Sequence, residues 1–316
     1  DLTDAEKESD LKANENFPAP LVEGYTVDGK LYGIPKDFDT NAVFYNKELF
    51  DKAGVEYPSD NMTFEDIKAT CEELKNAELT EGTYPTAVNR NSGQTTYDAS
   101  VFANGGYFLS EGNEKSGWDD PKTIEAVQSW LDLVSEGLSP TLDQMADTDP
   151  DAMFQGGQLA MYLSGNYMIA SYDKTLEGKY GIAKRPTYNG KDTDIINGLA
   201  FSVSANTKHP EEATDFALWL GSEEAQKING EAGVCISARN DCQQYFVDAH
   251  EGLNCQIFLD NVANAELLPH CKITSQLGQV EKKYLEPAWK GEVKLEDACK
   301  SVAEEQNKLL EEMNAK

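Results

Sequence analysis

Two short runs of β-favouring residues near the N-terminus are separated by a tight-turn dipeptide. Apolar and aromatic side chains dominate residues 25–27 and 31–34, and Asp28-Gly29 stands between them. An Asp-Gly pair flanked in this way is a strong short-range signal for a β-hairpin. We therefore expect a hairpin here, and we expect Pro35 to end its second strand.

A polar segment follows and leads into another apolar run. Residues 36–41 include Lys36, Asp37 and Asp39, and the apolar run occupies residues 42–45. The polar segment leaves no room for a helix between the two strands. This pattern predicts a strand that leaves one sheet, crosses with its polar groups exposed and enters another sheet, as a connection between two lobes does.

Helical and strand-like patterns alternate along the rest of the chain. Residues 63–76 begin with Thr63 and Asp66, close to a capping box, and continue with apolar residues at helical spacing. The alternation predicts an α/β protein. We expect further helices over residues 46–54, 120–137, 209–220, 222–230 and 295–313, and strands over residues 84–88, 181–186 and 195–203.

The helix that opens at His209 has an apolar stripe. Ala213, Phe216, Ala217 and Leu220 recur at helical spacing, so they are expected to form its buried face.

Several strings of this sequence resemble one protein family. DGKLYGIP at residues 28–35, Asp39 and YNKELFDKAG at residues 45–54 resemble the first crossover of bacterial extracellular solute-binding proteins, in the sugar-binding branch related to maltose-binding protein. FQGGQLAM at residues 154–161 and the helix at residue 209 are similar to further motifs of that family in the same order. The resemblance covers nearly the whole chain.

The resemblance implies a fold and a function. The fold is an α/β, two-lobed, periplasmic-binding-protein-like fold with strand crossovers and a ligand cleft. It would place residues 1–38 and 199–236 in lobe I, and residues 39–198 and the C-terminal helices of 237–316 in lobe II. The implied function is to bind a carbohydrate, with an oligosaccharide as the ligand, and to deliver it to a membrane ABC permease by hinge closure. The protein would be a monomer outside the cell, anchored by lipid as a lipoprotein or held in the periplasm.

The resemblance also implies which residues contact the sugar. Asp39 would accept hydrogen bonds from hydroxyls, and Tyr167 would stack on a sugar ring. Asparagine and arginine side chains would fix the orientation of the ligand. The full set is Phe38, Asp39, Thr40, Asn89, Tyr97, Asn166, Tyr167, Asn197, Gly198 and Arg239.

The sequence departs from the family pattern in three places. Family members begin with a βαβ segment, and this sequence starts after the point that corresponds to it, so an N-terminally truncated chain is expected. Ser237 stands where the family has a proline before Arg239. Residues 269–276 lack the cleft aromatic that many members carry, so the ligand preference of maltose-binding protein does not transfer.

Composition narrows the possible partners. The chain has 316 residues and a formal charge of -29, which would repel nucleic acid and anionic lipid. No window approaches the roughly 18 apolar residues of a membrane span, and residues 1–12 have no signal-peptide pattern. The cysteines are even in number without C-x-x-C spacing, so disulfides and buried free thiols both remain open, and zinc is disfavoured.

No catalytic or cofactor motif is present in the sequence. The three histidines have no metal-ligand spacing, and Asp147, Asp149 and Asp151 lack the glycine and bidentate acid of a calcium loop, which favours a helix-capping role. We therefore predict a binding protein without cofactor, metal or catalytic residues. The alternatives are a carbohydrate-active enzyme with two carboxylates, or a binder of a polyamine, a peptide or another solute.

Overall fold

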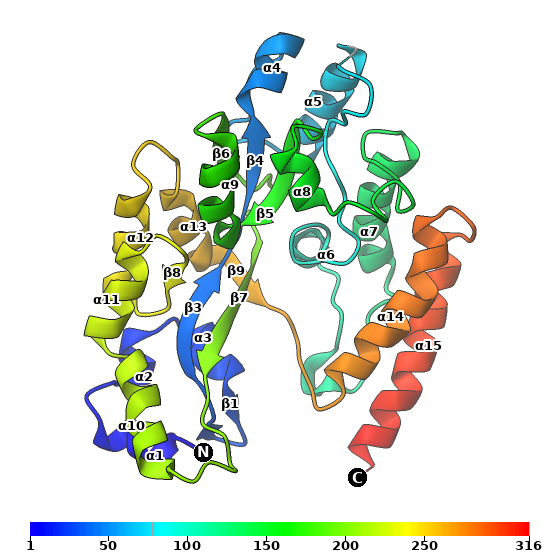
Figure 1. Ribbon diagram of the computed structural model, residues 1–316. Helices are drawn as coiled ribbons and strands as arrows, with labels where there is room; N and C mark the ends of the chain where they lie inside the picture. The colour runs from blue at the N-terminus through cyan, green and yellow to red at the C-terminus, as the bar shows by residue number, and fades with distance from the viewer. Residues whose placement is uncertain (78, 316) are drawn as a thin grey trace. The chain divides into compact units, whose positions relative to one another are not determined.

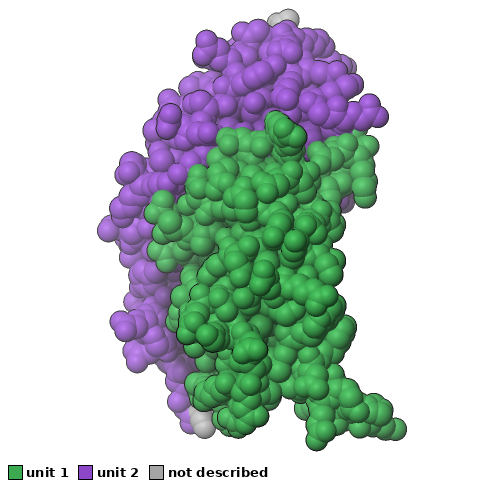
Figure 2. Space-filling view, turned by 90° about the vertical axis from the view of Figure 1, so that its left-hand side faces the viewer, with its two compact units in different colours: residues 1–42, 165–175, 194–267 green, residues 43–164, 176–193, 268–316 purple. Residues whose placement is uncertain are grey.

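The computed structural model describes residues 1–77 and 79–315. The chain folds as two units, coloured green and purple in Figure 2. Unit 1 contains residues 1–42, 165–175 and 194–267, and unit 2 contains residues 43–164, 176–193 and 268–316. The chain therefore passes from one unit to the other more than once, as the sequence predicted.

The boundaries of the units differ from the expected ones. Residues 237–267 were expected in lobe II, and they lie in unit 1. The reason is strand pairing, because β8 (Ile236–Ser237) and β9 (Ala265–Leu267) belong to the sheet of unit 1. Residues 165–175, also expected in lobe II, lie in unit 1 as well.

Unit 1 is built on a four-stranded sheet in the order β8-β3-β7-β9. The strand β3 (Ile34–Asp39) pairs antiparallel with β7 (Asp194–Phe201) and with β8, and β7 pairs parallel with β9. Figure 1 shows β3 in blue beside β7 in green. The remaining elements of unit 1 are α1 (Thr3–Glu8), α2 (Ala13–Asn16), α3 (Ala19–Gly24), β1 (Thr26–Val27), β2 (Lys30–Leu31), η2 (Asn166–Met168), nearly all of α9 (Ile169–Leu176), α10 (Pro210–Leu220), α11 (Glu223–Glu231), η3 (Asn240–Cys242), α12 (Gln244–Ala249), α13 (Gln256–Asp260) and η4 (Asn261–Asn264).

Unit 2 has a three-stranded sheet in the order β5-β4-β6 and a large apolar core. Aromatic side chains such as Phe64, Trp118 and Trp130 lie in that core. The long helices α14 and α15 pack side by side at the C-terminus (Figure 1). The elements are β4 (Asn41–Asn46), α4 (Lys47–Ala53), α5 (Phe64–Asn76), α6 (Asp98–Asn104), η1 (Glu111–Asn113), α7 (Pro121–Ser135), α8 (Pro150–Gln155), β5 (Met161–Gly165), β6 (Tyr180–Lys184), α14 (Thr274–Trp289) and α15 (Leu295–Asn314).

Local signals in the sequence set several of these elements. Asp28 and Gly29 both have positive φ in the turn between β1 and β2, so the hairpin is confirmed. The capping box of α5 is also present, with the Thr63 hydroxyl accepting from the backbone N–H of Asp66 at 3.1 Å. Asp149 caps α8 by accepting from the N–H of Ala152 at 2.9 Å, as a helix-capping acid should.

Two predicted strand limits are wrong. Pro35 lies inside β3, because a shift of register between Pro35 and Asp37 absorbs the missing donor. The strand expected over residues 84–88 is reduced to an isolated bridge between Tyr84 and Leu159. Beyond that bridge the backbone bonds elsewhere, since the N–H of Thr86 donates to the carbonyl of Leu138.

The expected buried face of α10 is also wrong in part. Ala217 is buried, whereas Phe216 is 59% exposed. The Phe216 ring instead stacks on the exposed ring of Trp219, with centroids 5.9 Å apart. Helical spacing therefore identified the apolar stripe correctly, but the other described residues bury only part of it.

Candidate functional site

Strand pairing in unit 1 brings together several of the residues expected to bind sugar. Asp39 lies opposite Asn197, and Phe38 lies opposite Gly198, in the β3–β7 ladder. Asn197 is exposed and Asp39 is half-buried, so polar groups from both strands reach the surface side by side. Phe38 is buried, and its carbonyl accepts a hydrogen bond from Asn166 Nδ2 at 3.2 Å.

Tyr167 has the exposure that a stacking residue needs. Its side chain is 44% exposed in η2, directly after β5. A Cβ added at Gly165 would lie 2.3 Å from Cε1 of Tyr167, so the ring lies against a backbone that only glycine leaves uncovered. Asn166, its neighbour, is buried and faces Phe38.

Thr40 and Gly198 make structural contacts within unit 1. The Thr40 hydroxyl is fully buried and donates to the carbonyl of Phe258 at 2.8 Å. A Cβ at Gly198 would lie 2.6 Å from the carbonyl oxygen of Asp37, so this glycine permits close approach between β3 and β7. Both residues hold the scaffold under Asp39 and Asn197.

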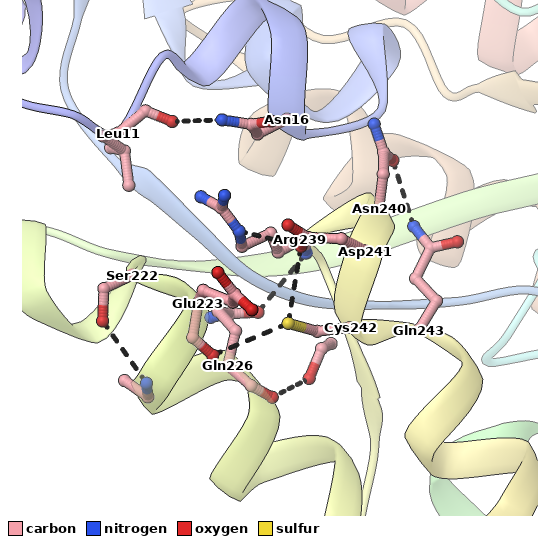
Figure 3. Close-up of polar contacts among 12 residues, drawn as sticks. Leu11, Asn16, Ser222, Glu223, Gln226, Arg239, Asn240, Asp241, Cys242 and Gln243 are labelled. Atoms are coloured by element: carbon pink, nitrogen blue, oxygen red, sulfur yellow. Dashed lines mark hydrogen bonds and ion pairs between the residues drawn. The ribbon is translucent and has the colours of Figure 1, made fainter.

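Arg239 makes a local ion pair. Its Nε lies 2.8 Å from Oδ1 of Asp241, although the N–H is not aligned for a hydrogen bond. The arginine side chain is only 11% exposed and lies beside Asp241 and Cys242 (Figure 3). Its backbone N–H faces Gln226 Oε1 at 3.4 Å, so Arg239 is anchored to α11 as well.

In unit 2, Asn89 and Tyr97 bound a loop that lines a cavity. Asn89 donates to the Tyr162 hydroxyl at 3.3 Å, and Tyr97 is buried with its ring stacked on Trp289. Arg185 holds the loop from behind by donating to the carbonyls of Gln94, at 3.3 Å, and Thr96. Burial raises the pKa of Tyr97 well above its ordinary value, so its hydroxyl stays neutral.

The cavity has a volume of about 410 Å³ and lies wholly within unit 2. This volume is in the range of about 300–1,000 Å³ typical of small-molecule sites. Its wall combines aromatic rings, aliphatic side chains, two carboxyl groups and two cationic side chains. The lining residues are Arg90, Asn91, Gly93, Tyr97, Asp98, Phe108, Leu109, Trp118, Leu268, Pro269, Thr274, Leu277, Gly278, Glu281, Lys282 and Leu285.

One buried acid, Asp98, and one partly buried acid, Glu281, dominate the electrostatics of this cavity. Burial raises the pKa of Asp98 to about 7, with the charge of Glu281 adding to the shift and that of Arg185 opposing it. Burial also raises the pKa of Glu281, while hydrogen bonds from Gln306 and Trp118 lower it. Neither residue was expected from the sequence, because neither lies in a motif that would distinguish it among 56 acidic residues.

Known proteins with similar sequences identify the family of this chain. A family model described as bacterial extracellular solute-binding protein matches residues 1–251. The chain belongs to this family. It is 24% identical over 251 residues to a putative binding protein of Brucella abortus, covering 74% of this chain and 59% of that protein. It is 27% identical over 224 residues to the arabinooligosaccharide-binding protein of Bacillus subtilis, covering 68% of this chain and 50% of that protein.

Solved structures agree on the fold. The family member from Listeria monocytogenes, an ABC substrate-binding protein in complex with cycloalternan, superposes with a TM-score of 0.86 at 23% identity, covering 97% of this chain and 78% of that one. Maltose-bound MalE3 of Thermotoga maritima gives a TM-score of 0.77 at 20% identity, covering 98% and 80%. The expected two-lobed α/β fold is confirmed. The chain spans about three fifths of the length of the first curated relatives.

Three further expectations can be set against the described residues. In residues 1–77 and 79–315, no helix has the length and apolar character needed to cross a membrane. The same residues bring together no group of three metal-ligating side chains of the His, Cys, Asp or Glu type. The six cysteines are free thiols, with Cys271 half-buried and the others buried.

Proposed function

We propose that this protein binds a carbohydrate, an oligosaccharide in particular, and delivers it to a membrane ABC permease. The observation that carries the proposal is the cavity of unit 2, in which aromatic rings and planar polar side chains share one wall. Aromatic faces pack on the apolar faces of sugar rings, and carboxylate and guanidinium groups pair with hydroxyls. Relatives named for arabinooligosaccharide, galactooligosaccharide and maltooligosaccharide binding support the same ligand class.

Unit 1 carries further candidate contacts to a sugar. Asp39 and Asn197 offer adjacent polar groups, and Tyr167 offers an exposed ring. Ligand contacts made only in a closed form would shift the population towards that form, which the permease would recognise. The protein would act as a monomer outside the cell, lipid-anchored or periplasmic, and without nucleic acid as a partner.

A thermal-shift screen tests this function. Mono- and oligosaccharides are compared with polyamines and short peptides, because a ligand of the folded state raises the melting temperature by mass action. A rise with sugars that is lost in Tyr167→Ala and Asp39→Ala supports the proposal. Tyr32→Ala is the matched control, since Tyr32 is also a 44% exposed tyrosine of unit 1 outside the proposed site.

Two results would contradict the proposal. A shift with polyamines or peptides alone would replace the ligand class. Recovery of a chemically altered sugar after incubation would make the protein an enzyme, since the proposed binder returns its ligand unchanged.

A further inference from the structure

Asp98 is a buried acid without hydrogen-bond donors. It begins α6, is 7% exposed and lines the cavity of unit 2. No residue that the structure describes donates a hydrogen bond to its carboxylate. A Cβ at Gly93 would lie 2.3 Å from Oδ1, so the carboxylate is held against the bare backbone of the loop. Buried carboxylates normally accept hydrogen bonds, so this carboxylate is open to a donor from a ligand in the cavity.

A second carboxyl group from another helix faces the same cavity. Glu281 of α14 accepts from Trp118 Nε1 at 3.1 Å and from Gln306 Nε2 at 2.8 Å, both on Oε1. These two donors hold the carboxyl group in position. Glu281 and Asp98 lie close enough for their charges to interact unfavourably. Two carboxyl groups from elements far apart in sequence thus face the same cavity.

The nearby cationic side chains are engaged elsewhere or exposed. Arg185 donates to the carbonyls of Gln94 and Thr96 behind the loop. Arg90 pairs with Glu286 at 3.4 Å, and Lys282 is an exposed residue of the lining. Burial and the charge of Glu281 raise the pKa of Asp98, and the positive charge of Arg185 offsets that rise only in part. A cation from outside the chain would therefore meet two carboxyl groups.

We propose that the cavity receives a cationic nitrogen of the ligand, so that the carbohydrate bound by this protein is an amino sugar. The inference rests on the proposed carbohydrate-binding function and specifies its ligand. An ammonium group would donate to Asp98 and compensate the charge of both acids, which a neutral hydroxyl does not do. Tyr97, Phe108 and Trp118 add aromatic walls, against which a cation and a sugar ring are both favourable.

The raised pKa of Asp98, about 7, agrees with this geometry. Without a bound cation, the carboxyl group is mostly neutral below about pH 7, because burial penalises the charge. A bound ammonium group would favour the ionised form instead. The carboxyl group of Asp98 would then release its proton when the ammonium group binds.

Binding is tested with matched sugar sets that differ at one carbon. Each set contains the amine, its N-acetyl derivative and the parent hydroxyl sugar, from monosaccharide to tetrasaccharide, and affinity is measured by calorimetry. We expect the amine to bind at least tenfold more tightly than its two counterparts. Asp98→Asn should remove that preference, because it keeps the shape of the side chain and removes its charge. Glu292→Gln, an exposed acid of the same unit, is the matched control and should leave the preference intact.

Glu281→Gln provides a second variant, with the same expected loss of preference, if Asp98→Asn fails to fold. Equal affinity for amine and hydroxyl sugars, or a preference that survives both variants, overturns the amino-sugar inference and leaves the carbohydrate function standing. Failure of every sugar set to bind overturns both.

Discussion

Arg185 supports the binding loop from behind, and its removal should be costly. The side chain is 4% exposed, and it donates to the carbonyls of Gln94 and Thr96 while opposing the charge of Asp98. In Arg185→Met, two acceptors lose their donor, at about 1–3 kcal/mol each when buried. The carboxyl group of Asp98 also loses the nearby positive charge of Arg185, so the whole change is expected to cost about 3–5 kcal/mol.

The assay is thermal unfolding followed by circular dichroism. In a unit of about 150–250 residues, 1 kcal/mol corresponds to about 2–4 °C, so the melting temperature should fall by roughly 6–20 °C. The fall should be larger at pH 8 than at pH 5, because Asp98, with a pKa of about 7, is ionised only at the higher pH and only then needs a nearby positive charge.

Arg90→Met is the matched control. It removes the same atoms from an ion pair in which Arg90 is 11% exposed and Glu286 is 36% exposed, so the expected loss is smaller than that of Arg185→Met. The reasoning is refuted if Arg185→Met costs no more than Arg90→Met, or if its cost is the same at both pH values and in an Asp98→Asn background.

Four further predictions follow from individual side chains. Asp98→Asn should raise the melting temperature at pH 8 and not at pH 4. Because the pKa of this carboxyl group is raised in the folded protein, the native state loses stability as pH rises from about 4 to about 7. Equal effects at both pH values in a melting series would contradict this. Asp194→Asn should destabilise unit 1 in thermal unfolding by about 1–3 kcal/mol for each donor that loses its acceptor. The buried carboxylate accepts from the backbone and side-chain nitrogens of Asn41 and from Asn261 at 2.9 Å each, and Asp194→Glu should not rescue the loss. Native protein treated with a thiol reagent at pH 8 should label Cys271 first, since the other cysteines are buried, and labelling of all thiols at one rate would contradict the fold. Thr63→Ala should cost about 1 kcal/mol by removing the cap of α5, measured against Thr70→Ala on the exposed face of the same helix.

Sequence patterns predicted elements whose causes are local. The turn at Asp28 and Gly29 depends on two residues that tolerate positive φ, and the start of α5 depends on side chains within one helical turn. Gly54 ends α4 with a φ of 69° for the same reason. Such signals are complete within a few residues, so they can be recognised without the rest of the chain.

Part of the proposed site could also be predicted from short motifs. Asp39 and Tyr167 were expected from motifs, and the structure places Asp39 opposite Asn197 and exposes the Tyr167 ring. Motif position did not reveal that Thr40 and Gly198 serve the scaffold, since the carbonyl of Phe258 and that of Asp37 reach them only through tertiary packing. Their roles as ligand contacts stay predictions without support from their surroundings.

By itself, the sequence determined the α/β class, the family, the charge and most helices, because these depend on composition, periodicity and short motifs. Only the tertiary structure decided which acids matter, since Asp98 and Glu281 meet in one cavity from helices far apart in the chain. It also decided that residues 237–267 belong with unit 1 and that Phe216 is exposed. Burial, strand partners and shifted pKa values depend on neighbours distant in sequence, which periodicity does not encode.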